Sequence, residues 1–470
     1  MTILDPATEE PLATYADAGD AVVDEAVASS VVGQTAWAAL TPSARGHYLW
    51  KFAEAIRAHA PHLAEAEAIS AGKPIRDARV EAGAVANMVE YYAGWADKIY
   101  GDVVPVPTSH LNYTLRQPLG VILQITPWNA PAVTCGWQIA PALATGNAAL
   151  LKPSELTPLT SLMLAKIAID AGLPRGLFNV IAGYGHTSGA AAIKDPRTRK
   201  VVFIGSPRNG QRIAAMASET LTPCLLELGG KSANIVFADA DLDRAVRGAQ
   251  QAIYAAAGQS CVAGSRLLVQ RAAYDRVLDM LAKTVPNIPT GLPLDENTHV
   301  GPINNQAQFD RVHELLGIAR TEDGGRVVVG GNRPAGLDRG FFLKPTVLAD
   351  LSLDARVSQE EIFGPVLSVY PFDDEAEAVA VANGTAFGLA GAVWTRDVGR
   401  AHRVAAGVNA GTFWINAYKT ISVMSPFGGF GASGYGRSSG REVLAEYTQV
   451  KSVWTETAAE PANAFGYMPE

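Results

Sequence analysis

The first hundred residues alternate between apolar and polar positions at the spacing of amphipathic helices. Between residues 18 and 100, apolar side chains recur three or four positions apart, and glycine or proline interrupts the pattern. The two longest runs are GDAVVDEAVASSVVGQTAWAAL and ARGHYLWKFAEAIRAHAPHLAEAEAISAG. The stretch LNYTLRQPLG, around Pro118, alternates and is predicted to be extended. This part of the chain is therefore predicted to be helical and to end in a strand.

From Gly120 onward, the pattern changes to short apolar runs separated by helical stretches. Strand, helix and strand in this order are typical of a parallel, doubly wound sheet, whose ligands bind beyond the carboxyl ends of the strands. The expected strands are VILQI (121–125), AALLK (148–152), FNVIA (178–182), KVVFI (200–204) and CLLEL (224–228). We therefore expect an α/β unit here, with a ligand site at one edge of its sheet.

A second α/β unit is predicted after residue 230. Asp241 is a favourable N-cap for a helix that should end near Gly258, which places Cys261 in the following loop. The apolar face of this helix is Leu242, Ala245, Val246, Ala249, Ala252 and Ile253. Strand-like runs recur in SRLLVQ, FFLKPTVL, VLSVYPF and AGAVWT. Near the C-terminus, EYTQVKSVWTET alternates again and could pair with the extended stretch near residue 115.

Composition narrows the class of protein. A chain of 470 residues, 48% of them hydrophobic, is long enough for two or three globular domains, and its net charge of -8 disfavours nucleic acid or an anionic membrane as partner. The N-terminus lacks the apolar core of a signal peptide, and no run approaches the ~20 apolar residues of a membrane span. Cys135, Cys224 and Cys261 show neither metal-ligand spacing nor a disulfide framework. We expect a cytoplasmic protein without a bound metal.

Three polar residues are candidates for chemistry. Cys261, in GQSCVAGSR, is either a nucleophile or a small buried residue, and its own segment favours the second interpretation. Glu227, inside an apolar run, should have a raised pKa that suits a general base, with a structural carboxylate as the alternative. Asn129, in QITPWNAP, could donate to an oxyanion or simply cap a helix. None of the three is decisive alone.

Further segments at strand ends suit a nucleotide. In LLKPSE, Lys152 and Glu155 lie where a nucleotide would, and a glutamate there can bind a ribose and repel a 2′-phosphate. In FIGSPRNG, Gly205 and Ser206 precede a helix whose N-terminus suits a pyrophosphate. GYGHTSG, which includes Gly185, is one residue off the dinucleotide fingerprint. Solvated or tight turns are the alternative for each segment.

In combination, these segments resemble the motifs of the aldehyde dehydrogenase superfamily, over essentially the whole chain. The matching motifs, in order, are TPWNAP, LKPSELTP, FIGSPRNG, LELGGKSANIVFADADLD, GQSCVAGSR, EEIFGPVL, NGTAFGLAGAVWT and SPFGGFGASGYGR. The resemblance implies an NAD(P)-dependent enzyme of the hydrolytic type that does not acylate coenzyme A. It also implies that Cys261 is the nucleophile, against the interpretation that its own segment favours.

The resemblance implies a mechanism for oxidising an aldehyde to its carboxylic acid. Cys261 would attack the aldehyde to give a thiohemiacetal, which loses hydride to the nicotinamide and becomes a thioester that water hydrolyses. Glu227 would be the general base, and Asn129 and the Cys261 backbone N–H the oxyanion hole. Two alternatives stay open. One is a coenzyme-A-acylating dehydrogenase, whose members generally lack the glutamate of E-L-G-G; the other is a catalytically silent member that binds or supports a partner.

The resemblance further implies contacts for the cofactor and the substrate. Glu155 favours NAD, with NADP left open. The implied cofactor contacts are Thr126, Pro127, Trp128, Lys152, Ser154, Glu155, Gly185, Gly205, Ser206, Leu228, Gly229, Glu361 and Phe363. The implied substrate contacts are Thr134, Trp137, Val262 and Phe427. Because these are mostly apolar, an uncharged aliphatic or aromatic aldehyde is expected. Lys419 is the one candidate partner for a charged tail, and a solvated loop lysine is the favoured alternative.

Three positions depart from the family pattern. Ile204 and Arg208 replace threonine and glutamate beside the cofactor loop, and Ser438 stands where many members have a glutamate. A second carboxylate that relays protons in some relatives is therefore missing, so Glu227 is expected to act without it.

The fold implied by the resemblance is α/β and has three parts. A Rossmann-like NAD-binding domain would comprise residues 1–99 and 119–229, and an α/β catalytic domain residues 230–444. Residues 100–118 and 445–457 would form a small β-element for oligomerisation, followed by a tail at 458–470. Since this element joins subunits in the family, a homodimer or homotetramer is expected.

Overall fold

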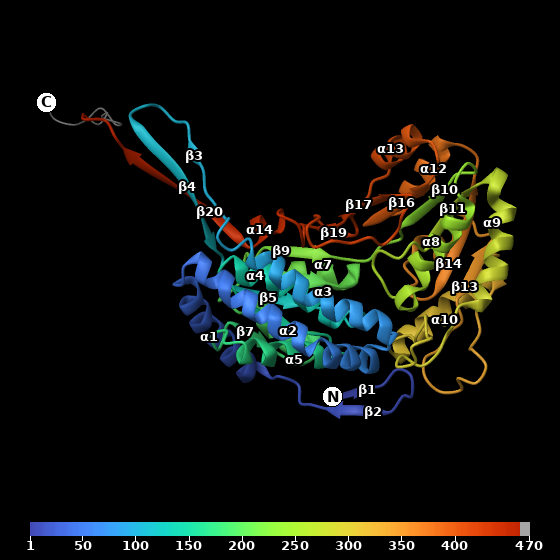
Figure 1. The fold of residues 1–470 in the computed structure, drawn as a ribbon, viewed down its shortest axis with the longest axis horizontal. Coiled ribbons are helices and arrows are strands. Elements are labelled where there is room, and N and C mark those ends of the chain that lie inside the picture. The colour runs from blue at the N-terminus through green and yellow to red at the C-terminus, as the bar shows by residue number, and fades with distance from the viewer. Residues whose placement is uncertain (461–470) are drawn as a thin grey trace.

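Two sheets lie side by side in the molecule, and a third, smaller sheet projects away from them (Figure 1). The structure is a computed structural model that describes residues 1–460. Most of the tail predicted at 458–470 therefore lies outside the described residues. In the part of the chain that is described, no helix is both long and apolar enough to cross a membrane.

The first sheet contains the strands expected between residues 121 and 228. These are β5 (Val121–Ile125), β6 (Ala148–Lys152), β7 (Phe178–Val180), β8 (Thr198–Ile204) and β9 (Cys224–Glu227). They pair in parallel in the order β9, β8, β5, β6, β7, and β19 (Gly434–Tyr435) adds an antiparallel edge beside β9. All five predictions are confirmed, although β7 and β9 end earlier and β8 begins earlier than the sequence indicated.

The helices around this sheet include those predicted before residue 100. Thr41 caps α2 by accepting a hydrogen bond from the Ala44 backbone N–H at 3.2 Å, and the helix ends at Gly72, whose φ of 76° suits a glycine. The helices are α1 (Asp20–Ala38), α2 (Pro42–Ala71), α3 (Ile75–Ala93), α4 (Pro131–Ala144), α5 (Leu159–Asp170), α6 (Ala190–Lys194) and α7 (Pro207–Ser218), with a π-helical turn η1 (Gly185–Gly189).

The second sheet confirms the second α/β unit. Its strands are β12 (Arg326–Val329), β13 (Thr346–Ala349), β14 (Val366–Phe372), β11 (Arg266–Gln270), β10 (Ala233–Val236), β16 (Ala390–Trp394) and β17 (Thr412–Ile415), in spatial order. All pair in parallel except β12, which is antiparallel at one edge. The run FFLKPTVL forms a strand only after Pro345, because proline has no N–H to donate to a ladder.

Helices and short elements complete this unit. The helices are α8 (Leu242–Tyr254), α9 (Arg271–Thr284), α10 (Gln306–Thr321), α11 (Arg356–Gln359), α12 (Glu375–Asn383) and α13 (Val398–Gly407). Helix α14 (Val443–Glu446) instead packs against the first unit, where Val443 and Leu444 are buried. The short elements are β1 (Thr2–Leu4), β2 (Pro11–Thr14), β15 (Phe387–Gly388), β18 (Phe430–Gly431) and the 3₁₀ turns η2 (Ala255–Gly258) and η3 (Val285–Asn287).

Helix α8 begins as predicted and then passes into an unusual turn. Asp241 caps it by accepting from the Arg244 backbone N–H at 3.1 Å, and the predicted apolar face is buried. The helix ends at Tyr254 rather than near Gly258, because Ala256 and Ala257 in η2 have φ values of 55° and 53°. Left-handed backbone is unfavourable for alanine, so this turn stores strain just before Cys261.

The projecting sheet joins two distant parts of the chain. It consists of β3 (Val103–Val104), β4 (His110–Pro118) and β20 (Thr448–Glu456), and Lys451 lies opposite Leu115. The predicted pairing of the C-terminal run with the stretch near residue 115 is thus confirmed. Figure 1 shows this sheet extending away from the two larger ones.

A buried group of charges joins α2, α3 and α4. Glu67, 1% exposed, accepts hydrogen bonds from the Ala132 backbone N–H at 3.3 Å and from the Thr160 hydroxyl at 3.0 Å. The Lys73 ammonium, in a side chain 2% exposed, lies 3.6 Å from Glu67 and also donates to Glu81. Burial raises the pKa of Glu67 to about 7, although the Lys73 charge opposes this shift. Lys73 therefore helps to hold Glu67 against the first turn of α4.

Replacing Lys73 with methionine is expected to lower the free energy of unfolding by about 3 kcal/mol at about pH 8, because two carboxylates lose their counter-charge. Without Lys73, the pKa of Glu67 should rise further, so the folded protein gains stability by binding a proton. The loss should therefore shrink as the pH falls below about 7. Thermal unfolding at about pH 8 and about pH 6 measures both effects, with the exposed Lys51→Met on the same helix as control. An equal loss at both values would contradict the ionised pair.

Candidate active site

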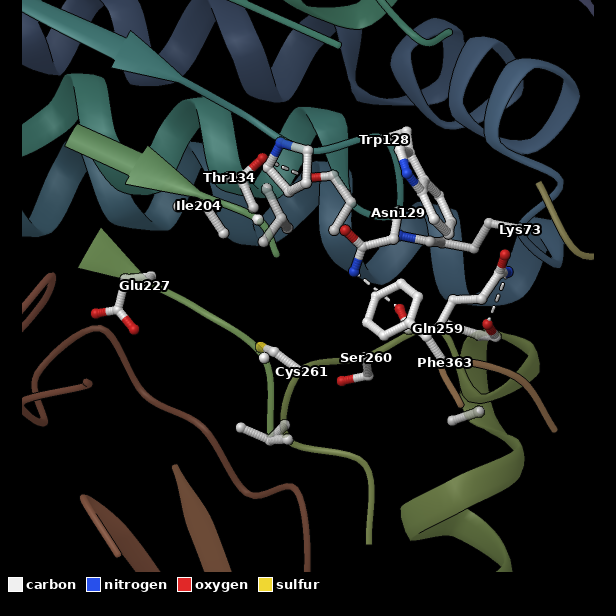
Figure 2. A pocket seen from close by; sticks show the side chains of 18 of the residues that line it. Lys73, Trp128, Asn129, Thr134, Ile204, Glu227, Gln259, Ser260, Cys261 and Phe363 are labelled. Atoms are coloured by element: carbon white, nitrogen blue, oxygen red, sulfur yellow. Dashed lines mark hydrogen bonds between the residues drawn. The ribbon is translucent and has the colours of Figure 1, made fainter. Parts of the chain in front are cut away.

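The two larger sheets contribute to one cavity of about 660 Å³. The carboxyl ends of β5, β8 and β9 lead into segments that line it on one side, as the doubly wound pattern predicts. The loop after α8 and the segment around Glu361 line it on the other side. Figure 2 shows Glu227, Asn129 and Cys261 around this space, each from a different segment.

The cavity brings together most of the predicted site residues. The three catalytic candidates Cys261, Glu227 and Asn129 line it, as do the four predicted substrate contacts Thr134, Trp137, Val262 and Phe427. Of the predicted cofactor contacts, those in the wall are Pro127, Trp128, Gly205, Ser206, Leu228, Gly229, Glu361 and Phe363. The site therefore combines both predicted functions in one space.

Five predicted cofactor contacts lie outside the cavity wall, namely Thr126, Lys152, Ser154, Glu155 and Gly185. Thr126 and Lys152 are neighbours at the carboxyl ends of β5 and β6, where the Thr126 N–H donates to the Lys152 carbonyl at 3.1 Å. The Lys152 ammonium lies 3.4 Å from the Glu155 carboxylate. These residues lie along the same sheet edge, while Gly185 begins the exposed turn η1.

Cys261 lies directly after the strained turn η2 and is partly exposed to the cavity. Burial and the negative charges of Glu227 and Glu361 raise the pKa of the thiol to about 12, while Lys419 and the Val262 backbone N–H oppose the shift. Near neutral pH the sulfur therefore keeps its proton. A nucleophilic role then requires a base that removes it.

Glu227 ends β9 and is 4% exposed. Within residues 1–460, neither carboxylate oxygen has a hydrogen-bond partner. Burial raises the pKa of Glu227 to about 8, and the nearby Ser438 hydroxyl and Arg437 charge oppose the shift in part. No hydrogen bond joins Glu227 to Cys261 within the described residues. Ser438, which departs from the family pattern, also lines the cavity.

Asn129 lies between β5 and α4, but it does not cap the helix. The N-cap position belongs to Ala130, whose side chain makes no capping hydrogen bond, so that alternative is wrong. The Asn129 amide instead donates to the Gln259 carbonyl at 2.8 Å, drawn as a dashed line in Figure 2. An amide nitrogen carries two hydrogens, so one remains for another acceptor. Gln259 is itself fixed, because its side chain accepts from the Asn304 backbone N–H at 2.8 Å.

The walls on the cofactor side fit a dinucleotide. Helix α7 begins here behind Ser206, so its first backbone N–H groups can face a pyrophosphate. Glu361 accepts from the Gly230 N–H at 2.9 Å, and a Cβ on Gly229 would lie 2.2 Å from its carboxylate. Glycine at 229 thus lets this carboxylate approach the backbone. Burial raises the pKa of Glu361 to about 7.

Phe363 is half-buried in a constrained loop of the cavity wall. Its φ is 56°, and its carbonyl accepts from the Gln308 side chain at 3.0 Å. Its ring meets that of Trp128 edge to face, with 5.3 Å between centroids. Two positions that differ from the family pattern, Ile204 and Arg208, flank Ser206. Ile204 lines the cavity, and Arg208 is exposed on the first turn of α7.

A charged part of the cavity wall was not predicted from the sequence. Lys73, Arg76, Asp77 and Glu81, from the junction of α2 and α3, and Arg311 of α10 all line the cavity. The first four belong to a segment predicted only as helical, no element was predicted around Arg311, and nothing in the local spacing indicates a ligand. Their role follows from the packing of α3 beside α4, which no local pattern specifies.

The aldehyde dehydrogenase family model matches residues 1–453. The chain belongs to the aldehyde dehydrogenase family. A betaine aldehyde dehydrogenase of Cereibacter sphaeroides is 44% identical, covering 97% of this chain and 93% of the relative. An aldehyde dehydrogenase of Emericella nidulans is 42% identical, covering 96% and 90%.

Solved structures agree with the sequence relatives of this aldehyde dehydrogenase. PnpE of Pseudomonas sp. WBC-3 in complex with nicotinamide adenine dinucleotide has a TM-score of 0.97 at 41% identity, covering 99% of this chain and 96% of that one. Betaine aldehyde dehydrogenase of Staphylococcus aureus in complex with NAD+ has a TM-score of 0.96 at 36% identity, covering 99% and 93%. The predicted family, α/β fold, oxidoreductase class and nicotinamide cofactor are confirmed.

Proposed function

We propose that this aldehyde dehydrogenase converts an aldehyde to the free carboxylic acid with NAD, through a covalent intermediate on Cys261. The observation that carries the proposal is that Cys261, Asn129 and Glu227, from three separate segments, line one cavity. Bound NAD supplies the acceptor for a hydride. The chain itself supplies a nucleophile, oxyanion donors and a base.

In the first half of the reaction, the Cys261 sulfur bonds to the aldehyde carbon, and the thiol proton passes through a water to Glu227. The negative charge that develops on the aldehyde oxygen is stabilised by the second N–H of Asn129 and the Cys261 backbone N–H. Once the carbon has lost its hydride, the group on the sulfur is a thioester.

Before the second half, Glu227 releases the thiol proton to solvent. Water then attacks the thioester carbon while Glu227 accepts a proton from it, the carbon–sulfur bond breaks to release the acid, and the proton on Glu227 returns to the Cys261 sulfur. The coenzyme-A-acylating alternative would replace this water by a thiol. Glu227, which has no hydrogen-bond partner within the described residues, supports water activation instead. The three candidate groups lining one cavity also argue against the catalytically silent alternative.

NAD rather than NADP is the cofactor that the sheet edge supports. Glu155, whose side chain is 37% exposed, sits at the end of β6 beside Lys152. A carboxylate there can accept from a ribose hydroxyl and repels a 2′-phosphate. The two NAD complexes named above support the same choice, while use of NADP as a second cofactor stays open.

An aldehyde with an apolar body suits the substrate side of the cavity. The Trp137 and Phe427 rings meet edge to face with 5.4 Å between centroids, and Val262 adds an aliphatic surface. These walls support the predicted aliphatic or aromatic aldehyde. The relatives named for betaine aldehyde suggest instead that a charged group can be part of such a substrate.

We keep three further inferences as proposals. The division into an NAD-binding domain, a catalytic domain and an oligomerisation element follows the three sheets. The projecting sheet exposes Val103 and Leu115 on one face and Val450 and Trp454 on the other, and these exposed apolar side chains support its role in a homodimer or homotetramer. A cytoplasmic location stays a prediction from the cysteine content.

The proposed function is tested by incubating the purified chain with a panel of aldehydes and NAD. We expect NADH and the free acid in equal amounts, no acyl-coenzyme A when coenzyme A is added, and a higher kcat/KM for NAD than for NADP. Acyl-coenzyme A as the main product would favour the acylating alternative. NAD binding without NADH formation from any aldehyde would favour the silent one.

A further inference from the structure

Lys419 lies in the wall of the cavity, not in solvent. The sequence suggested a solvated loop lysine, but the structure places Lys419 partly buried in the loop after β17, facing the same cavity as Cys261. Its φ is 59°, and that of Asn416 is 51°, so two non-glycine residues of this loop are left-handed. Such strain persists only where surrounding contacts impose it.

Contacts on both sides hold this loop in place. Before Lys419, the Asn416 side chain donates to the Thr395 carbonyl at 3.0 Å and accepts from the Thr395 N–H at 3.1 Å. After it, the Thr420 carbonyl accepts from the Trp414 indole at 2.9 Å. Lys419 is therefore presented to the cavity by a fixed backbone.

The other cations of the cavity wall are paired. Lys73 donates to Glu81, and Arg76 lies 3.3 Å from Asp77. Arg311 similarly pairs with Glu314 at 2.9 Å and with Glu360. Lys419, by contrast, has no ion pair or hydrogen bond from its ammonium to any of residues 1–460. Its ammonium is the charge in this wall that is free to bind a ligand.

The electrostatic surroundings place this ammonium on the substrate side. Burial lowers the pKa of Lys419 to about 8; the nearby Cys261, Glu81 and Asp77 oppose the shift, and Lys73 adds to it. The groups that act on Lys419 are thus the sulfur and the α2–α3 segment, not the cofactor wall. With a pKa of about 8 the side chain remains mostly charged near neutral pH.

We propose that Lys419 determines substrate specificity by selecting aldehydes that carry a second, anionic group, such as a carboxylate, over aldehydes that carry a cationic one. This inference rests on the proposed function and refines its substrate class. The apolar walls at Trp137 and Phe427 would contact the carbon chain between the aldehyde and the anion. An unpaired charge in a partly water-excluded wall attracts an opposite charge and repels a like one, so it discriminates in both directions.

Kinetics on matched aldehydes test the proposal. The series comprises ω-oxocarboxylates, n-alkanals and trimethylammonio-aldehydes of equal chain length, betaine aldehyde being the shortest cationic member. With the wild-type chain and NAD, we expect the highest kcat/KM for an anionic member and the lowest for a cationic one. Lys419→Met should lower kcat/KM for the anionic aldehydes about 10- to 100-fold, mainly through KM, because a charge-assisted hydrogen bond is lost. It should change the neutral ones less than about 3-fold.

Lys419→Arg should keep most of the anionic preference, and the exposed Lys51→Met is the control for an unspecific loss of a lysine. An equal fall for all three series in Lys419→Met would overturn the proposal, because Lys419 would then act on the Cys261 thiol rather than on the substrate. A wild-type preference for cationic aldehydes would also overturn it. Oxidation of no aldehyde at all would instead overturn the proposed function, so the two failures are distinct.

Discussion

Replacing Cys261 with alanine is expected to lower aldehyde oxidation at least about 10⁴-fold, because removal of a covalent nucleophile disables every later step. The backbone N–H of residue 261 and the Asn129 amide remain, so only weak residual activity should persist. NADH formation under saturating NAD and aldehyde measures the loss, and NAD binding should be unchanged.

The chain offers a matched control for this substitution. Cys224, on β9, is partly buried and lies outside the cavity wall, so Cys224→Ala should keep activity within about 3-fold. Cys135 is a poorer control, because its burial in the core would add a packing defect. Cys261→Ala with more than a tenth of wild-type activity would refute the covalent mechanism.

Replacing Glu227 with glutamine is expected to lower kcat about 10²- to 10⁴-fold, the range of general-base catalysis. A base acts only when deprotonated, and the pKa of Glu227 is raised to about 8. Wild-type kcat/KM should therefore rise with pH through a limb near 8, and this limb should be absent in Glu227→Gln. The exposed Glu25→Gln serves as control. A variant that kept the limb would assign it to another group.

The same substitution should leave the fold intact, which separates chemistry from structure. Since the folded-state pKa is raised above the ordinary 4.5, protonation of Glu227 favours folding, and this contribution is lost as the pH rises to about 8. Glutamine carries no charge at any pH. The free energy of unfolding of Glu227→Gln, compared with that of the wild type, should therefore be higher at about pH 8 than at about pH 5. Thermal unfolding at both values provides the check.

Local pattern was enough for most of the regular structure. Strands such as β5 and β6 are short apolar runs between turns, and both match their predicted bounds. The face of α8 follows from helical periodicity, and its start follows from Asp241. The end of α8 did not follow, because the left-handed Ala256 and Ala257 have no local cause. Tertiary packing around the cavity imposes that turn.

The sequence predicted only those residues of the candidate site that belong to recognisable motifs. Cys261, Glu227 and Asn129 were named from short segments that end strands or follow a helix, and the fold brings these segments together. The charged wall from α2 and α3 was not predicted, because a helix that contacts a ligand has the same periodicity as one that faces solvent. Lys419 was misinterpreted for a related reason: burial of a loop residue depends on what the rest of the chain places over it.

The close approach of two backbones at Gly258 has a consequence for how this site can change. A Cβ there would lie 1.9 Å from the Gly364 carbonyl, so the loop before Cys261 and the loop with Phe363 touch through main-chain atoms alone. A side chain at position 258 would therefore push the segment before Cys261 away from the loop that holds Phe363. On the proposed mechanism, substitutions at Lys419 or along α3 would change which aldehyde enters and leave this backbone contact unchanged. Substrate selectivity and the reaction at Cys261 can therefore be altered by substitutions in separate parts of this enzyme.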